Sequence, residues 1–200
     1  DLVDEKIIKI KRGNEIGSEN YGTGDIPFIR TSELSNWEII ADATHCTSED
    51  IYAKYKSTQK LEPEDILVVN DGTYLMGRAA MLTEIDTKIV IQSHIRQIKV
   101  LDKNRLSPYL LLGLIGLRVI QKQIEAKSFR QGTISTLGNR LLEVKIPIPK
   151  NPKISEQLAK LVQDSIEKKK AARTLVQNYS FNGCVENLMG INNKAKLGNL

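Results

Sequence analysis

Cysteine is scarce in this sequence. Its 200 residues include only Cys46 and Cys184, and no CxxC pair occurs. This excludes a disulfide-stabilised scaffold, and a reducing cytoplasmic compartment fits best. His45 and Cys46 form the only cluster of histidine and cysteine. A structural zinc site needs four such ligands, so we expect no metal site.

Long apolar runs are also absent. The longest, residues 109–117, is much shorter than the ~20 residues of a membrane-spanning helix. No basic segment followed by an apolar one opens the chain, which argues against a secretory signal. We therefore expect no membrane partner. Because the sequence begins with Asp1 rather than Met, we expect it to be a piece of a longer protein.

Signatures of catalysis and of nucleotide binding are missing as well. The chain has no GxSxG motif and no glycine-rich methyltransferase loop. Gly72 and Gly77 have the spacing of a phosphate-binding loop, but Arg78 replaces its lysine and Ala79 replaces its hydroxyl residue. The following residues resemble a strand, not the helix whose N-terminus would hold phosphate. We therefore expect no cofactor and a binding protein rather than an enzyme.

One enzymatic alternative stays open, a metal-dependent nuclease that uses Asp65, Asp86 and Lys88. Such chemistry requires the carboxylates to converge on one ion. Asp86 and Lys88, however, fall in an expected turn, where charged residues are common. The nuclease is accordingly the less favoured hypothesis.

Positive and negative charges are unevenly distributed along the chain. The net charge is +5, but residues 1–50 contain 5 basic and 11 acidic side chains, whereas residues 101–150 contain 9 basic and 3 acidic ones. A basic second half suits a polyanionic partner, although a solvated basic face would have the same composition.

The first hundred residues have the pattern of short strands and loops. Strands are expected at residues 6–10, 26–30, 65–69 and 94–101, with a hairpin formed by 78–83 and 88–92. Pro27 lacks an N–H group, which predicts an edge strand for residues 26–30. Residues 47–50 supply a helix cap and predict a short helix that ends near Tyr55.

Helical periodicity appears in the second half. Ser107 and Pro108 predict the start of a helix that reaches about Ala126. Its expected buried side consists of Leu111, Leu114, Ile115, Val119 and Ile124. Residues 129–132 are expected to form a loop and residues 143–148 a strand.

A second helix of about seven turns is expected from Ile154. Leu158, Val162, Ile166 and Leu175 recur on one face of it. So long an amphipathic helix favours pairing with another helix over packing on its own domain.

Polar loops separate the strands and contain the residue types that contact DNA. Arginine pairs with guanine, asparagine and glutamine pair with adenine, and serine or threonine contact phosphates or bases. The candidate DNA-binding residues are Arg30, Thr31, Ser32, Asn70, Thr73, Tyr74, Gln92, His94, Arg130, Gln131 and Thr133.

Six segments, in this order, carry a resemblance to a known family: GDIPFIRTSEL (24–34), LEPEDILVVNDGTYLMGR (61–78), IQSHIRQI (91–98), SPYLLLGL (107–114), RQGTISTLG (130–138) and VKIPIPKNPKISEQLAKLV (144–162). The chain resembles the target recognition domain of type I restriction-modification specificity subunits. It is also similar to the C-terminal specificity domain of fused N6-adenine DNA methylases. The resemblance covers about residues 5–178.

The resemblance implies an α+β fold, in which a small mixed β-sheet recognition domain with packed helices precedes one long C-terminal spacer helix. We expect a DNA target recognition domain at 1–150, the spacer helix at 151–180 and a flexible tail at 181–200. In the family, two recognition domains each read half of a bipartite site, and their spacer helices pair. The implied partners are double-stranded DNA, an adenine methylase subunit or domain, and a second recognition domain or a second copy of the chain.

This sequence contains only one recognition domain, so it is consistent with half of a dimer, a fragment of a two-domain subunit, or the tail of a fused methylase. In the family the module is not catalytic and directs a methylase, and in some systems a restriction subunit, to its site. The alternative is a protein-interaction module that assembles through the C-terminal helix.

Overall fold

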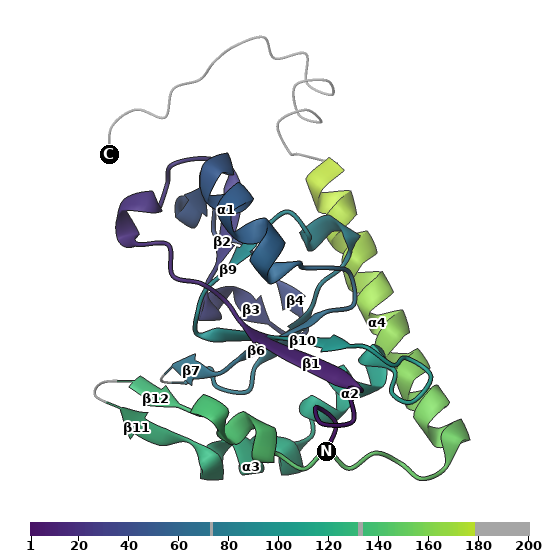
Figure 1. Cartoon of the computed structure of the whole chain (residues 1–200). Helices are drawn as coiled ribbons and strands as arrows, with labels where there is room; N and C mark the ends of the chain where they lie inside the picture. The colour runs from purple at the N-terminus through teal and green to yellow at the C-terminus, as the bar shows by residue number, and fades with distance from the viewer. Residues whose placement is uncertain (73, 132–133, 179–200) are drawn as a thin grey trace, which may run out of the picture.

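The computed structural model describes residues 1–72, 74–131 and 134–178. It has the expected α+β fold (Figure 1). The helices are α1 (Glu49–Gln59), α2 (Pro108–Ile115), α3 (Arg118–Lys127) and α4 (Pro152–Asn178). The strands are β1 (Ile8–Arg12), β2 (Ile26–Ile29), β3 (Leu34–Ser35), β4 (Glu38–Ile39), β5 (Cys46–Thr47), β6 (Ile66–Val69), β7 (Asp71–Gly72), β8 (Ala79–Met81), β9 (Val90–Ile91), β10 (Ile95–Val100), β11 (Phe129–Gln131) and β12 (Ile134–Thr136).

The largest sheet is antiparallel and has the order β1-β10-β6-β8. Its central strand β6 has the sequence ILVV, and all four side chains are buried. Ile66 and Val68 belong to the core cluster beneath α2, whereas Leu67 and Val69 belong to the cluster on the other face. Because both faces are covered, this strand shows no polar alternation.

Strand β2 is not an edge strand, which corrects the expectation drawn from Pro27. It lies between β5 and β9 in a three-stranded sheet. Residues 26 and 27 pair antiparallel with β5, and Phe28 and Ile29 pair parallel with β9. Each neighbour therefore covers only half of the strand. Pairing with β9 begins only after the proline, so its missing N–H interrupts no bond on that side.

The expected hairpin between residues 78–83 and 88–92 is wrong. Strand β8 pairs with β6, and β9 pairs with β2. Between them, residues 84–86 form a short 3₁₀ segment, in which the Asp86 carboxylate accepts hydrogen bonds from the backbone N–H and hydroxyl of Thr83. This segment sends the chain to a different sheet instead of turning it back on β8.

The single helix expected from residue 108 to residue 126 is two helices. They are separated at Gly116 and Leu117, where Leu117 has an extended backbone with φ −65° and ψ 139°. Glycine is a weak helix former. The break lets α3 pack Ile120 and Ile124 against Leu137, while Val119, which was expected to be buried, is exposed.

Two further segments differ from expectation. Residues 129–131, expected as a loop, form β11, which pairs with β12 as a hairpin. Residues 144–148, all in the described part of the chain, pair with no strand. Pro147 and Pro149 each lack an N–H group, so an IPIP segment is a poor ladder partner.

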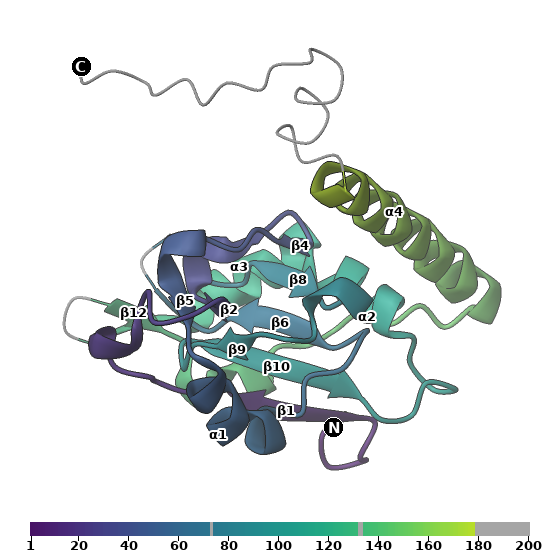
Figure 2. The ribbon, with the colours of Figure 1, turned by 90° about the horizontal axis from the view of Figure 1, so that it is seen from above.

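Helix α4 confirms the expected long helix and lies along one side of the molecule (Figures 1 and 2). Val162 and Ile166 are buried in the same cluster as α2, and burial of such side chains stabilises by about 1.5–3 kcal/mol each. A Cβ added to Gly113 of α2 would lie 2.9 Å from Val162, so glycine permits this close approach.

Ion pairs hold the second half of α4. Arg173 contacts the buried carboxylate of Asp86 at 2.5 Å, and Lys169 contacts Glu38 at 3.2 Å.

The division into 1–150, 151–180 and 181–200 remains a prediction, and residues 181–200 lie outside the described residues. Among the described residues, no helix combines the length and apolarity that crossing a membrane requires.

Candidate nucleic-acid interface

A pocket of about 390 Å³ forms where three loops meet, and we call it the loop pocket. The first loop follows β2, the second contains β7, and the third joins β9 to β10. The lining residues are Arg30, Thr31, Ser32, Asp71, Gly72, Tyr74, Leu75, Gln92 and His94. Six of the candidate DNA-binding residues are therefore brought together from separate segments.

Strand pairing explains this convergence. Strands β2 and β9 run parallel with Ile29 opposite Ile91, so their C-terminal ends place Arg30 beside Gln92. Strand β10 begins opposite the end of β6, and the backbone N–H of Asn70 donates to the His94 carbonyl at 2.9 Å. The second and third loops are joined at that point.

The other candidates lie outside the pocket lining. Asn70 is fully buried, and its side-chain amide donates to Asp71 at 2.7 Å, so it does not face solvent. Arg130 is exposed on β11, in the hairpin that pairs with β7, and Gln131 ends the same strand. Thr73 and Thr133 lie outside the described residues.

Asp71 is a buried carboxylate in the lining of the loop pocket, and no sequence pattern marked it as a site residue. Its carboxylate accepts hydrogen bonds from Asn70 and from the hydroxyl of Thr136 on β12, and it lies 3.2 Å from Nδ1 of His94. Burial raises the pKa of Asp71, but hydrogen bonds from Thr136, His94 and Asn70 outweigh that effect and hold the pKa below its ordinary value. This charged carboxylate connects β7, β12 and the β9–β10 loop.

Arg30 is held by neighbouring groups rather than free. Its guanidinium donates to Glu33 at 2.6 Å and to Asp42 at 3.3 Å, and it lies 2.8 Å from Nε2 of His45. Hydrogen bonds from the Thr44 hydroxyl and N–H lower the pKa of Asp42 to about 2. Asp42 is therefore charged at neutral pH, and Arg30 is oriented by two carboxylates at the pocket wall.

Other side chains leave donors or rings available to a ligand. Tyr74 is 90% exposed at the rim, where an aromatic ring can contact a base or sugar. Arg12 and Arg96 both donate to the backbone carbonyl of Ser93, between the two pocket residues of the third loop. Arg96 is a charged residue inside a strand that otherwise contributes Ile95, Ile98 and Val100 to the core, and this contrast is the sequence signal that could have identified it.

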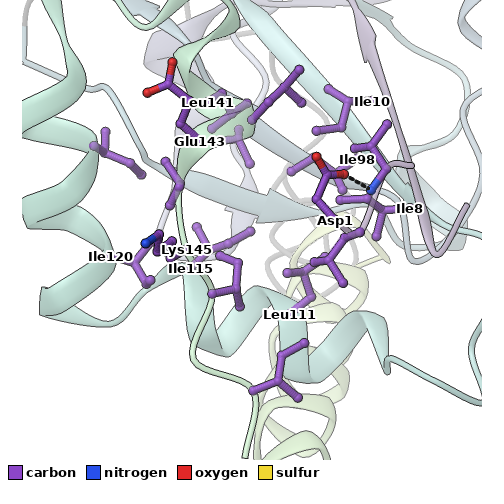
Figure 3. A pocket seen from close by; sticks show the side chains of 18 of the residues that line it. Asp1, Ile8, Ile10, Ile98, Leu111, Ile115, Ile120, Leu141, Glu143 and Lys145 are labelled. Atoms are coloured by element: carbon purple, nitrogen blue, oxygen red, sulfur yellow. Dashed lines mark hydrogen bonds between the residues drawn. The ribbon is translucent and has the colours of Figure 1, made fainter. Parts of the chain in front are cut away.

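A larger pocket of about 670 Å³ lies between β1, β10 and α2 (Figure 3). Its lining is mostly aliphatic and includes Ile8, Ile98, Leu111 and Ile115, with Lys145 among the few charged members. It lacks the convergent polar groups of the loop pocket, and we assign no chemistry to it.

The nuclease hypothesis finds no support in this geometry. Asp65 is bound to Gln97, Asp86 to Arg173, and Lys88 to Glu49. Within the described ranges, no three His, Cys, Asp or Glu side chains are grouped to hold a metal ion. Residues 79–81, which follow Gly77 and Arg78, form strand β8, as expected, and not the helix whose N-terminus would hold a nucleotide phosphate.

Comparisons with known proteins include one family match and two fold matches. The family model "Type I restriction modification DNA specificity domain" matches residues 5–174. The crystal structure of the S subunit of the type I restriction-modification system from M. genitalium has a TM-score of 0.57 and 16% identity, and the match covers 85% of this chain and 39% of that one.

A second solved structure comes from work on complex assembly and conformational transition of the type I restriction-modification system. It has a TM-score of 0.50 and 15% identity over 88% of this chain and 40% of that one. These likenesses concern the fold, and the chain spans about two fifths of the length of either protein. No curated protein matches the chain in sequence.

Proposed function

The chain belongs to the family of type I restriction-modification DNA specificity domains, and on this premise we propose that it reads one half of a bipartite DNA target. The supporting observation is the loop pocket, where Arg30, Gln92 and His94 meet from loops that are distant in sequence. Side chains of these types contact base edges and phosphates. The module itself catalyses no reaction. It brings a catalytic partner to the target site on DNA.

The partner we propose is an adenine DNA methylase, present as a separate subunit or as a fused domain. We propose that the DNA-contact and protein-contact surfaces lie on different sides of the fold. Strand β12, which pairs with β7 next to the loop pocket, lies on the side opposite α4 in both views (Figures 1 and 2). DNA bound at the pocket therefore leaves α4 free for protein contacts.

We further propose that α4 pairs with the helix of a second recognition domain or a second copy of the chain. Val162 and Ile166, expected on the pairing face, pack on α2 of the same chain. A neighbouring stripe remains exposed, and we call it the exposed seam: Ile154, Leu158, Leu161 and Leu175. Ile154, Leu158 and Leu161 have the four-and-three spacing of a coiled-coil seam. Leu175 follows two heptads later, with Ser165, Lys168 and Ala172 at the seam positions between them.

Selection from a random duplex library tests the proposal. The whole chain is immobilised, with and without a cognate methylase, and the retained duplexes are sequenced. We expect one short motif to be enriched by the chain alone, and two copies at fixed spacing when the assembly forms. If neither arm enriches a sequence, the proposed function is wrong.

A further inference from the structure

Two arginines face each other directly across strands β1 and β10. In the antiparallel register, Arg12 of β1 pairs with Arg96 of β10. Like charges directly opposite in a sheet are destabilising, so an unligated protein gains nothing from this arrangement. We call these two residues the arginine pair.

The arginine pair converges on a single acceptor. Nε of Arg12 donates to the Ser93 carbonyl at 2.9 Å, and Nη1 of Arg96 donates to the same oxygen at 3.3 Å. Each guanidinium carries five N–H donors, so most of the donors of the pair are not used by this oxygen. In the described ranges, neither side chain forms an ion pair with a carboxylate.

Acidic groups near the pair are engaged elsewhere. The Asp71 carboxylate accepts hydrogen bonds from Thr136 and Asn70, and Glu15 accepts one from the Ser93 hydroxyl. Burial lowers the pKa of Arg96. The charge of Asp71 opposes this shift, and the charge of Arg12 adds to it. The positive charge of the pair is therefore only partly offset within the chain.

A second like-charged pair on the same strands shows the contrast. Lys9 stands opposite Lys99, on the other face of the sheet. Lys99, however, contacts Glu62 at 2.9 Å and Asp65 at 3.7 Å, so its charge is balanced by the protein. Among the described side chains, neither Arg96, which lies on the same strand as Lys99, nor Arg12 has such a carboxylate contact.

We propose that Arg12 and Arg96 bind one phosphate of the DNA backbone at the border of the loop pocket, an inference that rests on the proposed function. Planar guanidinium groups match the oxygens of a phosphate, and two of them around one anion remove their mutual repulsion. Ser93 separates Gln92 from His94, so a phosphate held here would fix the position of the duplex against both pocket residues.

Salt-dependent binding by the full chain tests this site, with the library-selected duplex and an unrelated duplex of equal length as probes. In Arg12→Gln we expect affinity to fall about tenfold on both duplexes. The slope of log affinity against log salt should decrease by about 1. Arg96→Gln should do the same, and Arg12→Lys should restore part of the affinity.

Lys9→Gln is the matched control, because it removes one charge from the same strand on the other face; its salt slope should equal that of the wild type. Arg12 is exposed, so Arg12→Gln should unfold at the same temperature as the wild type or higher, since repulsion is relieved. An unchanged salt slope in Arg12→Gln, or a changed sequence preference instead of a uniform loss, would overturn the phosphate site alone. A wild-type chain that binds no duplex would overturn the proposed function with it.

Discussion

Asp71 connects the loops of the pocket through hydrogen bonds to its carboxylate. Sequence patterns identified six of the pocket residues through their types, because Arg, Gln and His in polar loops resemble DNA-contacting groups. They did not identify Asp71, since an Asn-Asp-Gly segment has the composition of a simple turn. Only strand pairing reveals that Asp71 faces Thr136, which is distant in the chain. Asn70 shows the opposite error, a polar residue that proved to be buried.

The variant Asp71→Asn should lower the free energy of unfolding at pH 7 by about 1–3 kcal/mol, because a carboxylate with three partners is lost. The pKa of Asp71 is depressed in the folded chain. Its contribution is therefore complete above the unfolded pKa of about 3.9 and disappears as pH falls through the lower folded value. Urea unfolding at several pH values measures this.

The control for Asp71 is Thr136→Val, which removes one donor and keeps the carboxylate. It should lose some stability at pH 7 but retain the decline in acid. If Asp71→Asn and the wild type show the same acid dependence, the carboxylate does not have the role assigned to it.

At the scale of elements, periodicity located most strands and the long helix but not their partners. Residues 65–69 and 94–101 formed strands as expected, because alternation or continuous burial marks them directly. Partners depend on the whole fold, so the expected hairpin at 84–87 was wrong. Helix α1 extends past Tyr55 to Gln59. It ends where Lys60 takes the left-handed conformation, with φ 47°, that glycine usually supplies, so no glycine in the sequence marked this end.

The Arg173–Asp86 ion pair should anchor the second half of α4. In Arg173→Met the buried Asp86 carboxylate loses its cation, and the free energy of unfolding should fall by about 3 kcal/mol. The double variant with Asp86→Asn should recover part of this loss, since no buried charge is then left unpaired. Urea unfolding of all four chains measures the coupling, and full additivity of the two single effects would show that the pair is not an anchor.

The exposed seam and the buried face of α4 should respond differently to acidic substitutions. Leu161→Glu with Leu175→Glu should abolish helix pairing while leaving the melting temperature of the single chain unchanged, because both side chains are mostly exposed. Val162→Asp, one residue away, should instead destabilise the fold, since it buries a charge against α2. Sedimentation and thermal melting separate the two effects. Unchanged assembly in the seam variant would place the pairing surface elsewhere.

For the whole molecule, the order of six segments predicted the fold class and the family, although each segment alone is loosely defined. The distribution of charge predicted a polyanionic partner only in general terms. Neither could show that the candidate loops meet in one pocket, or that this pocket lies away from α4, because both depend on the packing of several sheets. The proposed function therefore depends most on whether the loop pocket recognises a DNA sequence.

The most direct test compares the DNA motifs selected from a random duplex library by the wild-type chain, by Gln92→Ala and by Gln157→Ala. Gln92 lines the loop pocket, whereas Gln157 is an exposed glutamine on α4. We expect Gln92→Ala to relax or change the motif at one or two adjacent base pairs, while Gln157→Ala selects the wild-type motif. Identical motifs from all three chains would contradict the assignment of the loop pocket as the DNA-reading site.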